Sequence, residues 1–317
     1  MADAPLTMLD IAKRNGHDAI TGIIDEASLA TPEVSGIGQV GMNMTAIPGM
    51  GAARTITGRQ YKTLVRTALP SVGFRNANDG TDATKSSHEE RLVETFIMDP
   101  NWWVDKAVGD SSEDGWEALM AEEADAHLQG AFQTLGTQFY YGRDNGGDAS
   151  GNPGLIDVYD STNMEVDAGG STAKTSAWFV KFGPKYVQWV MGQGGAMTPT
   201  EVTLQRVTGS NSKQLTAYFQ ELHMYPGLQC KSLRAAVRIK NVGTDTGKGM
   251  TDSLLGSALS KYPAGIIPDV CFMTSRSREQ LRNSRTATTE TGKEADIPVT
   301  FQGIPIVVTE SITESES

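Results

Sequence analysis

The sequence predicts an α+β protein with long connections, and three observations support this fold class. The 317 residues include 34 glycines and 13 prolines but only 7% aromatic residues, which is typical of many turns around a modest core. Runs rich in Thr, Val and Tyr indicate strands. The stretch 111–141 repeats its apolar residues at the 3.6-residue period of an amphipathic helix. A hydrophobic fraction of 38% suffices for one elaborate domain or two to three subdomains.

The N-terminal part is predicted to contain a helix followed by an arm. Residues 6–29 have an amphipathic pattern that is interrupted at Gly16, and Thr7 with Asp10 has the spacing of a capping box. Residues 30–53 contain seven Gly or Pro and no periodicity, which predicts an extended arm. The chain shows no signal-peptide pattern and no apolar run near the roughly 18 residues of a membrane span. We therefore expect a soluble protein with no membrane partner.

The next segment is predicted to be a long two-stranded excursion. Strand-like runs cover Thr55–Leu69 and Arg91–Ile97, with a turn-rich middle at Asn76–Gly80. The first run mixes basic, aromatic and aliphatic residues without a clean apolar face. Because an isolated hairpin is at best marginally stable in water, we expect this segment to lie on another chain.

A helix over 111–141 follows, for which Ser111 and Asp114 predict a capping box, and the polar loop Gly142–Gly154 ends it. Residues 155–265 are predicted to be mixed α/β. Strands are expected at Ala177–Phe182 and Leu233–Asn241, and a helix near Pro184–Met191.

The C-terminal part is predicted to return to a buried sheet. The apolar run Asp269–Thr274 indicates a buried strand, and Ser277–Arg285 a basic helix. A strand over Ile297–Thr309 is expected to turn at Gln302–Gly303.

The motifs for catalysis and cofactor binding lack the neighbouring residues and elements that these functions require. Gly36–Gly41 matches G-x-G-x-x-G, but it lacks the preceding strand, the following helix and the acid about 20 residues later. Asp144–Asp148 lacks the glycine and the final glutamate of a calcium loop. His17, His88, His127 and His223 lie far apart and form no zinc motif. We therefore predict no enzyme, no catalytic residue, no cofactor and no metal.

The charges are separated along the chain although the net charge is −11. Residues 54–75 carry five bases and no acid, whereas 99–125 carry nine acids and only Lys106. Complementary potentials of this kind set register and encounter rate between partners. We expect the basic segment to lie over the acidic helix of an adjacent subunit; the alternatives are pairing within one chain or independent solvated faces. The candidate contact residues are Arg54, Arg59, Tyr61, Lys62, Arg66, Phe74, Arg75, Glu113, Asp114, Glu117 and Glu122.

A second basic group lies in the predicted C-terminal helix. It consists of Arg276, Arg278, Arg282 and Arg285. These residues are expected to face DNA or a neighbouring subunit, and the alternative is an ordinary exposed helix face. No basic cluster reaches the density that a dedicated DNA-binding protein needs.

Six stretches in this order resemble the major capsid proteins of tailed bacteriophages, which have the HK97-like fold. They run from near residue 54 almost to the C-terminus: Tyr61–Thr67, Val72–Asn78, Thr175–Val180, Ala235–Asn241, Asp269–Arg285 and Phe301–Thr309. The resemblance implies the following division of the chain: an N-terminal arm (1–53), an E-loop (54–98), a P-domain with a spine helix (99–154), an A-domain (155–265) and P-domain return strands and helix (266–317).

The resemblance also implies a function. The chain is expected to form hexamers and pentamers of an icosahedral shell around double-stranded DNA, with a portal, a separate scaffolding protein and decoration proteins as partners. Assembly is expected in the bacterial host cytoplasm and the final location in the virion capsid. The first alternative is an encapsulin-like nanocompartment shell, and the second is a soluble α/β enzyme.

Overall fold

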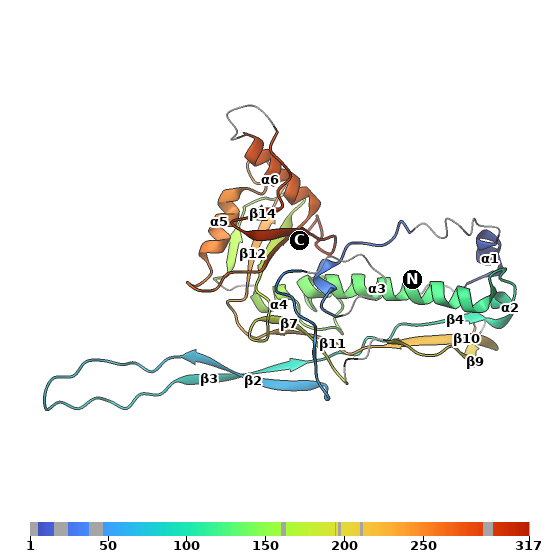
Figure 1. Ribbon diagram of the computed structural model, residues 1–317, viewed down its shortest axis with the longest axis horizontal. Coiled ribbons are helices and arrows are strands. Elements are labelled where there is room, and N and C mark those ends of the chain that lie inside the picture. Colours follow the sequence, from blue (N-terminus) through green and yellow to red (C-terminus); the bar gives the residue numbers. More distant parts are fainter. Residues whose placement is uncertain are drawn as a thin grey trace.

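The computed structural model has a long central helix, a sheet at one end of it, a flat ribbon of strands along it and a hairpin that projects away (Figure 1). The structure describes residues 6–15, 25–37, 47–159, 163–193, 195, 198–209, 212–287 and 294–316.

The largest sheet has six strands in the order β14-β15-β13-β6-β12-β5. The strands β12 and β13 both run antiparallel to β6, whereas β5 joins β12 and β15 joins β13 in parallel. Their bounds are β5 Glu165–Asp167, β6 Thr175–Val180, β12 Ala236–Val242, β13 Val270–Met273, β14 Thr300–Phe301 and β15 Ile304–Val308. The predicted buried strand and the turn at Gln302–Gly303, which has positive φ at both residues, are confirmed.

This sheet is buried on both faces, and the two-residue period of a strand divides its side chains between two cores. In β6, Trp178 and Val180 belong to the core shared with the central helix. Ala177 and Phe179 belong to the core covered by helices α5 (Asp252–Ser260) and α6 (Ser275–Ala287). The predicted basic helix lies within α6. All six β6 side chains are therefore buried in the interior of the chain.

The central helix α3 runs from Gly115 to Tyr141, 27 residues that span about 40 Å. The predicted capping box is wrong. The Asp114 side chain makes no capping hydrogen bond. The Ser111 hydroxyl donates to the Val108 carbonyl at 2.7 Å because a short helix, α2 (Lys106–Gly109), ends there.

The C-terminal end of α3 is held in an aromatic cluster. The Phe139 ring lies 5.6 Å from the ring centre of Trp189 and 6.3 Å from that of Phe272. The helix stops at Gly142, where φ is +62° and a Cβ atom would overlap Asp157 at the start of the short helix α4 (Leu155–Tyr159). Only glycine fits that conformation and that space.

Two smaller sheets lie along α3. One pairs β10 with β4, β8 and β9, and the other has the order β1-β7-β11. Their bounds are β4 Asn101–Asp105, β8 Thr198–Pro199, β9 Thr203–Thr208, β10 Gln214–His223, β1 Arg54–Thr55, β7 Val187–Met191 and β11 Pro226–Cys230.

The predicted helix over Pro184–Met191 is wrong, because this segment forms strand β7. Val187, Trp189 and Val190 suit a buried, pleated surface. Backbone pairing with β1 on one side and β11 on the other satisfies their amide and carbonyl groups.

The N-terminal segment differs from the long helix that the sequence predicted. Helix α1 is only Met8–Arg14, although the Thr7 and Asp10 capping box is present. Residues 16–24 lie outside the described residues. After them the Asp25 carboxylate accepts the Ala27 amide at 2.8 Å, a local hydrogen bond that competes with helix formation.

The predicted extended arm is docked rather than extended where the structure describes it. A 3₁₀ turn at Pro32–Val34 is packed into the core, and the Trp189 indole donates to the Glu33 carbonyl at 2.7 Å. The Ala30 carbonyl accepts the Glu310 amide at 3.1 Å, which ties the segment to the C-terminal part of the chain. Residues 38–46 lie outside the described residues.

The Glu33 side chain is fully buried between this turn, α3 and the C-terminal segment. Its carboxylate accepts hydrogen bonds from the Thr309 hydroxyl at 2.9 Å and, more weakly, from Tyr140 at 3.5 Å. Gly136 makes room for it, since a Cβ there would lie 2.6 Å from the Glu33 Oε1. Burial raises the pKa of Glu33 from 4.5 to about 7, and the accepted hydrogen bonds offset only part of the cost of desolvation.

Among the helices that the structure describes, none has the length and the apolar character to cross a bilayer.

The first prediction concerns the pH dependence that Glu33 gives to stability. Because its pKa is raised in the folded state, its contribution is complete below pH 4.5 and is lost as the pH rises to about 7. The free energy of unfolding should fall by up to about 1.4 kcal/mol per pH unit in that window. Glu33→Gln should remove this slope in denaturant titrations of the unassembled chain. The exposed Glu26→Gln is the control, and an unchanged slope in Glu33→Gln would contradict the prediction.

Candidate functional site

The most prominent surface feature is the hairpin of β2 (Gln60–Ala68) and β3 (Ser87–Glu94), which projects from the molecule (Figure 1). Strand β3 begins at Ser87, four residues before the predicted start at Arg91. Its antiparallel register with β2 pairs Arg66 with His88. The chain between the two strands, residues 69–86, has no helix or strand.

The base of the hairpin is attached to β11. The Tyr61 hydroxyl donates to the Gln229 side chain. The Phe96 amide donates to the Pro226 carbonyl at 2.8 Å. The Thr95 amide donates to the Arg59 carbonyl at 2.8 Å and so joins the two ends of the hairpin at its base. These contacts fix the direction in which the hairpin leaves the molecule.

Beyond the base, the hairpin exposes apolar side chains. The exposed fractions are 74% for Leu69, 91% for Val72 and 108% for Phe74. Leu64 and Leu92 on the strands are also exposed. The described part of the chain offers no cover for these side chains, so their apolar area can be removed from water only by another molecule.

The charges of the hairpin are divided between its two strands. Strand β2 and its flanks carry the predicted cations, whereas β3 carries Glu89, Glu90 and Glu94, which lie outside the basic stretch 54–75. Lys62 forms an exposed ion pair with Glu90 at 3.1 Å. Within the described residues, no ion pair engages Arg59 or Arg66. Arg75 donates to the Asp79 carbonyl in the loop at 2.8 Å.

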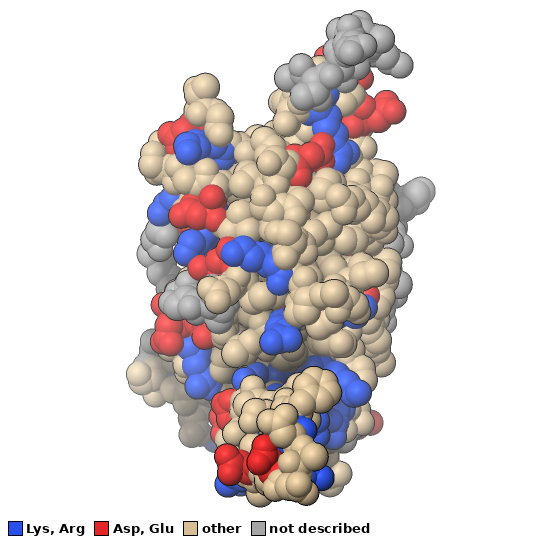
Figure 2. All heavy atoms as spheres, turned by 90° about the vertical axis from the view of Figure 1, so that its left-hand side faces the viewer, with Lys and Arg blue, Asp and Glu red and all other residues tan. Residues whose placement is uncertain are grey.

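Cations also gather at the base of the hairpin. The Arg54 guanidinium lies 4.3 Å from the ring centre of Tyr61, and the Lys231 ammonium lies 5.2 Å from it. Burial, followed by the repulsion of Arg54, lowers the pKa of Lys231. Figure 2 shows Lys and Arg side chains around the point where the hairpin joins the molecule.

An acidic groove lies along the middle of α3, between Glu122 and Thr134. It has two parts, with volumes of about 650 Å³ and about 790 Å³. The larger part is lined by Asp25, Glu26, Glu122, Glu123 and Asp125, together with Arg14. Arg14, at the end of α1, forms ion pairs with Glu123 at 2.6 Å and Glu122 at 3.6 Å.

The other acidic residues that were predicted to contact a neighbour lie at the start of α3. Glu113, Asp114 and Glu117 are exposed at its N-terminal end. Among the described residues, no ion pair joins these acids to the hairpin cations of the same chain. The pairing between subunits stays a prediction.

The second basic group is largely engaged by acids of its own chain. Arg285 forms a bidentate ion pair with Asp252, in which the Arg285 Nη2 lies 2.7 Å from the Asp252 Oδ1. Arg282 pairs with Glu294 at 2.6 Å. Arg276 donates to the Ala173 carbonyl at 2.6 Å. Arg278 is half-buried on the same helix. The expected contact of this group with DNA or a neighbour stays a prediction.

Sequence reasoning missed one cluster. Asp99, Glu221 and His223 come together although Asp99 is more than 100 residues away from the other two in the sequence. The signal that was available is the two-residue spacing of Glu221 and His223, which puts both on one face of a strand. Of the rejected motifs, Gly36–Gly41 lies partly outside the described residues. Asp144–Asp148 belongs to the loop after α3, where the Gln138 side chain binds the Asp148 backbone.

Comparison with known proteins identifies the fold. The chain resembles one chain of the structure of bacteriophage Epsilon15, with a TM-score of 0.69 and 20% identity, covering 100% of this chain and 98% of that one. It also resembles the capsid of bacteriophage JBD30, with a TM-score of 0.52 and 10% identity over 92% and 97% of the two chains. The fold is therefore the HK97-like fold of phage capsid proteins, and the predicted fold class is confirmed. No curated protein matches the sequence.

The family follows from the sequence profile of the Major capsid protein GP7 family, which matches residues 49–317. The chain belongs to this family. It is a structural protein of a bacteriophage capsid shell and not an enzyme, and it assembles with further copies of itself in the virion capsid.

The second prediction concerns the exposed apolar tip. Val72→Ser with Phe74→Ser should leave the midpoint of thermal unfolding unchanged, because both side chains are already in water. The double variant should form few or no shells under conditions in which the unaltered chain assembles, as measured by sedimentation velocity. Ile267→Ser, at an exposed apolar residue outside the hairpin, is the control. Normal shell formation by the double variant would show that the tip contacts no neighbour.

Proposed function

We propose that this chain forms hexamers and pentamers that close an icosahedral shell around double-stranded DNA. The observation that carries the proposal is the projecting hairpin, whose apolar tip has no cover in the described part of its own chain. A hairpin alone is marginal in water. A neighbouring subunit that covers it accounts for both its length and its composition.

The proposed parts of the subunit follow the chain order. Residues 54–98 are the E-loop, because they include the entire hairpin and its attachment to β11. The long helix α3 is the spine of the P-domain. The proposed bounds of the other parts are 1–53 for the N-terminal arm, 99–154 for the P-domain, 155–265 for the A-domain and 266–317 for the return of the chain to the P-domain.

We propose that the basic strand of one hairpin meets the acidic groove of the adjacent subunit. Arg59 and Arg66 supply cations without an ion-pair partner in the described part of the chain, and the groove supplies Glu122 and Asp125. Two such exposed pairs contribute roughly 0.2–1 kcal/mol each. Their main effect is on register and on the rate of encounter.

The proposed partners besides further copies are a portal, a separate scaffolding protein, packaged DNA and decoration proteins, with assembly in the bacterial cytoplasm. The formal charge of −11 favours DNA that is enclosed rather than tightly bound by the shell. Expression of the chain with and without a candidate scaffolding protein, followed by electron microscopy, tests the proposal. Closed shells or capsomers support it. A stable monomer contradicts it, and shells that enclose protein cargo without DNA during infection favour a nanocompartment instead.

The third prediction tests the charge pairing. Arg59→Glu with Arg66→Glu should raise the subunit concentration needed for assembly by roughly tenfold, since about 1.4 kcal/mol corresponds to that factor. Light scattering measures the effect, which should shrink as salt screens the charges.

The control is Lys261→Glu, a charge reversal of the same kind at an exposed position after α5. A second reversal in the groove, Glu122→Lys with Asp125→Lys, should restore assembly to the first variant. Assembly that is insensitive to the hairpin reversal would contradict the pairing.

A further inference from the structure

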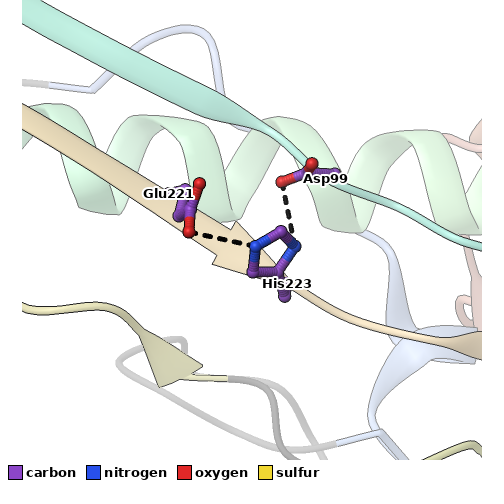
Figure 3. Close-up of side chains that lie close together, drawn as sticks. All are labelled: Asp99, Glu221 and His223. Atoms are coloured by element: carbon purple, nitrogen blue, oxygen red, sulfur yellow. Dashed lines mark ion pairs between the residues drawn. The ribbon is translucent and has the colours of Figure 1, made fainter.

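Three side chains on one face of a small sheet form a compact group with both nitrogen and oxygen ligands. The His223 imidazole lies between two carboxylates, with Nδ1 at 3.1 Å from Asp99 and Nε2 at 3.0 Å from Glu221 (Figure 3). One ligand atom of each residue lies within 4.8 Å of the others. We propose that Asp99, Glu221 and His223 form a binding site for a divalent transition-metal ion, and that zinc is the ion it fits best.

The backbone determines the positions of the three residues. In the antiparallel register of β10 and β4, Glu221 is opposite Asn101. The ladder continues through an isolated bridge between Met98 and Met224, which exchange two hydrogen bonds of 3.0 Å each. His223 therefore stands opposite Asp99.

Strand periodicity puts all the donors on one face. Glu221 and His223 are two residues apart on β10, and their side chains therefore point to the same side of the sheet. The same reasoning puts Asn101, which is paired with Glu221, on that side. Pairing of β10 with β8 on its other edge holds this end of the strand from both sides. The backbone of this framework therefore needs little movement for the side chains to bind an ion.

The charge of the group also favours a cation. Two carboxylates flank one imidazole, and His223 is the only ion-pair partner of Asp99 and Glu221 among the residues that the structure describes. With neutral imidazole the three side chains carry two negative charges. A divalent cation neutralises both at once, and it relieves the repulsion between carboxylates held on the same face.

The donor types select the ion. Imidazole nitrogen binds zinc and neighbouring transition metals well, whereas magnesium and calcium prefer sites made of oxygen alone. Zinc takes histidine and carboxylate ligands at about 2.0–2.2 Å. The separation of the ligand atoms requires rotation of the imidazole and the carboxylates, so that one ring nitrogen and two oxygens face one ion. The partial exposure of all three residues leaves room for water at the remaining position.

The bound ion would fasten two parts of the chain that the sequence separates by more than 100 residues. Asp99 lies between the end of the hairpin and β4, and the other two ligands lie at the end of β10. An ion here would strengthen the connection between the segment that follows the hairpin and the sheet of β4 and β10.

The fourth prediction is the test of this site. The unassembled full chain, without a histidine tag, is titrated with zinc chloride in an isothermal calorimeter. One zinc ion should bind per chain, and the midpoint of thermal unfolding should rise with zinc. His223→Ala and Asp99→Asn should each weaken binding at least tenfold and abolish the thermal shift. Near-ultraviolet circular dichroism confirms that the variants are folded.

Two comparisons make the result specific. His88→Ala removes an exposed imidazole on β3 and should leave zinc binding unchanged. Magnesium chloride should produce no comparable thermal shift. The proposal is overturned if the unaltered chain binds no zinc, or if His223→Ala and Asp99→Asn bind it as tightly as the unaltered chain does.

Discussion

The packing of the C-terminal half of α3 against the six-stranded sheet is the interaction on which the other parts of the subunit depend. Phe139 contacts Trp189 of β7 and Phe272 of β13, and thus joins two sheets to the helix. Trp189 in turn holds the Glu33 carbonyl and the N-terminal turn. Strand β11, which pairs with β7, carries the base of the hairpin. The direction of the hairpin is therefore set by the core and not by the hairpin itself.

This core leaves little apolar area of the sheet for contacts with other chains, because both sheet faces are buried. Contacts between subunits must use the parts outside it. The hairpin offers apolar side chains at its tip and cations on β2, and the middle of α3 offers an acidic groove. The residues that pack the core are therefore separate from the exposed residues that are available for contacts with neighbouring subunits.

The sequence predicted those elements whose patterns arise from local chemistry. The 27-residue α3 repeats its apolar residues at the helical period, and β13 is a short apolar run whose length is typical of a buried strand. Residues 184–191 were misassigned because their partners, β1 and β11, are distant in sequence and no local pattern reveals them. The docking of the N-terminal turn was missed for the same reason, since Glu33 is held by Thr309 and Tyr140. The group at His223 depends on strand register, which a single sequence does not specify.

Dependence of the hairpin on a neighbour is the central claim, and hydrogen exchange measures it most directly. The amides of β2 and β3 are compared by mass spectrometry in the unassembled chain and in closed shells, with the amides of β6 as an internal reference. We predict fast exchange in the unassembled chain and strong protection in shells, while β6 is protected in both. Equal protection of β2 and β3 in the two states would contradict the claim, because the hairpin would then be stable without a neighbour.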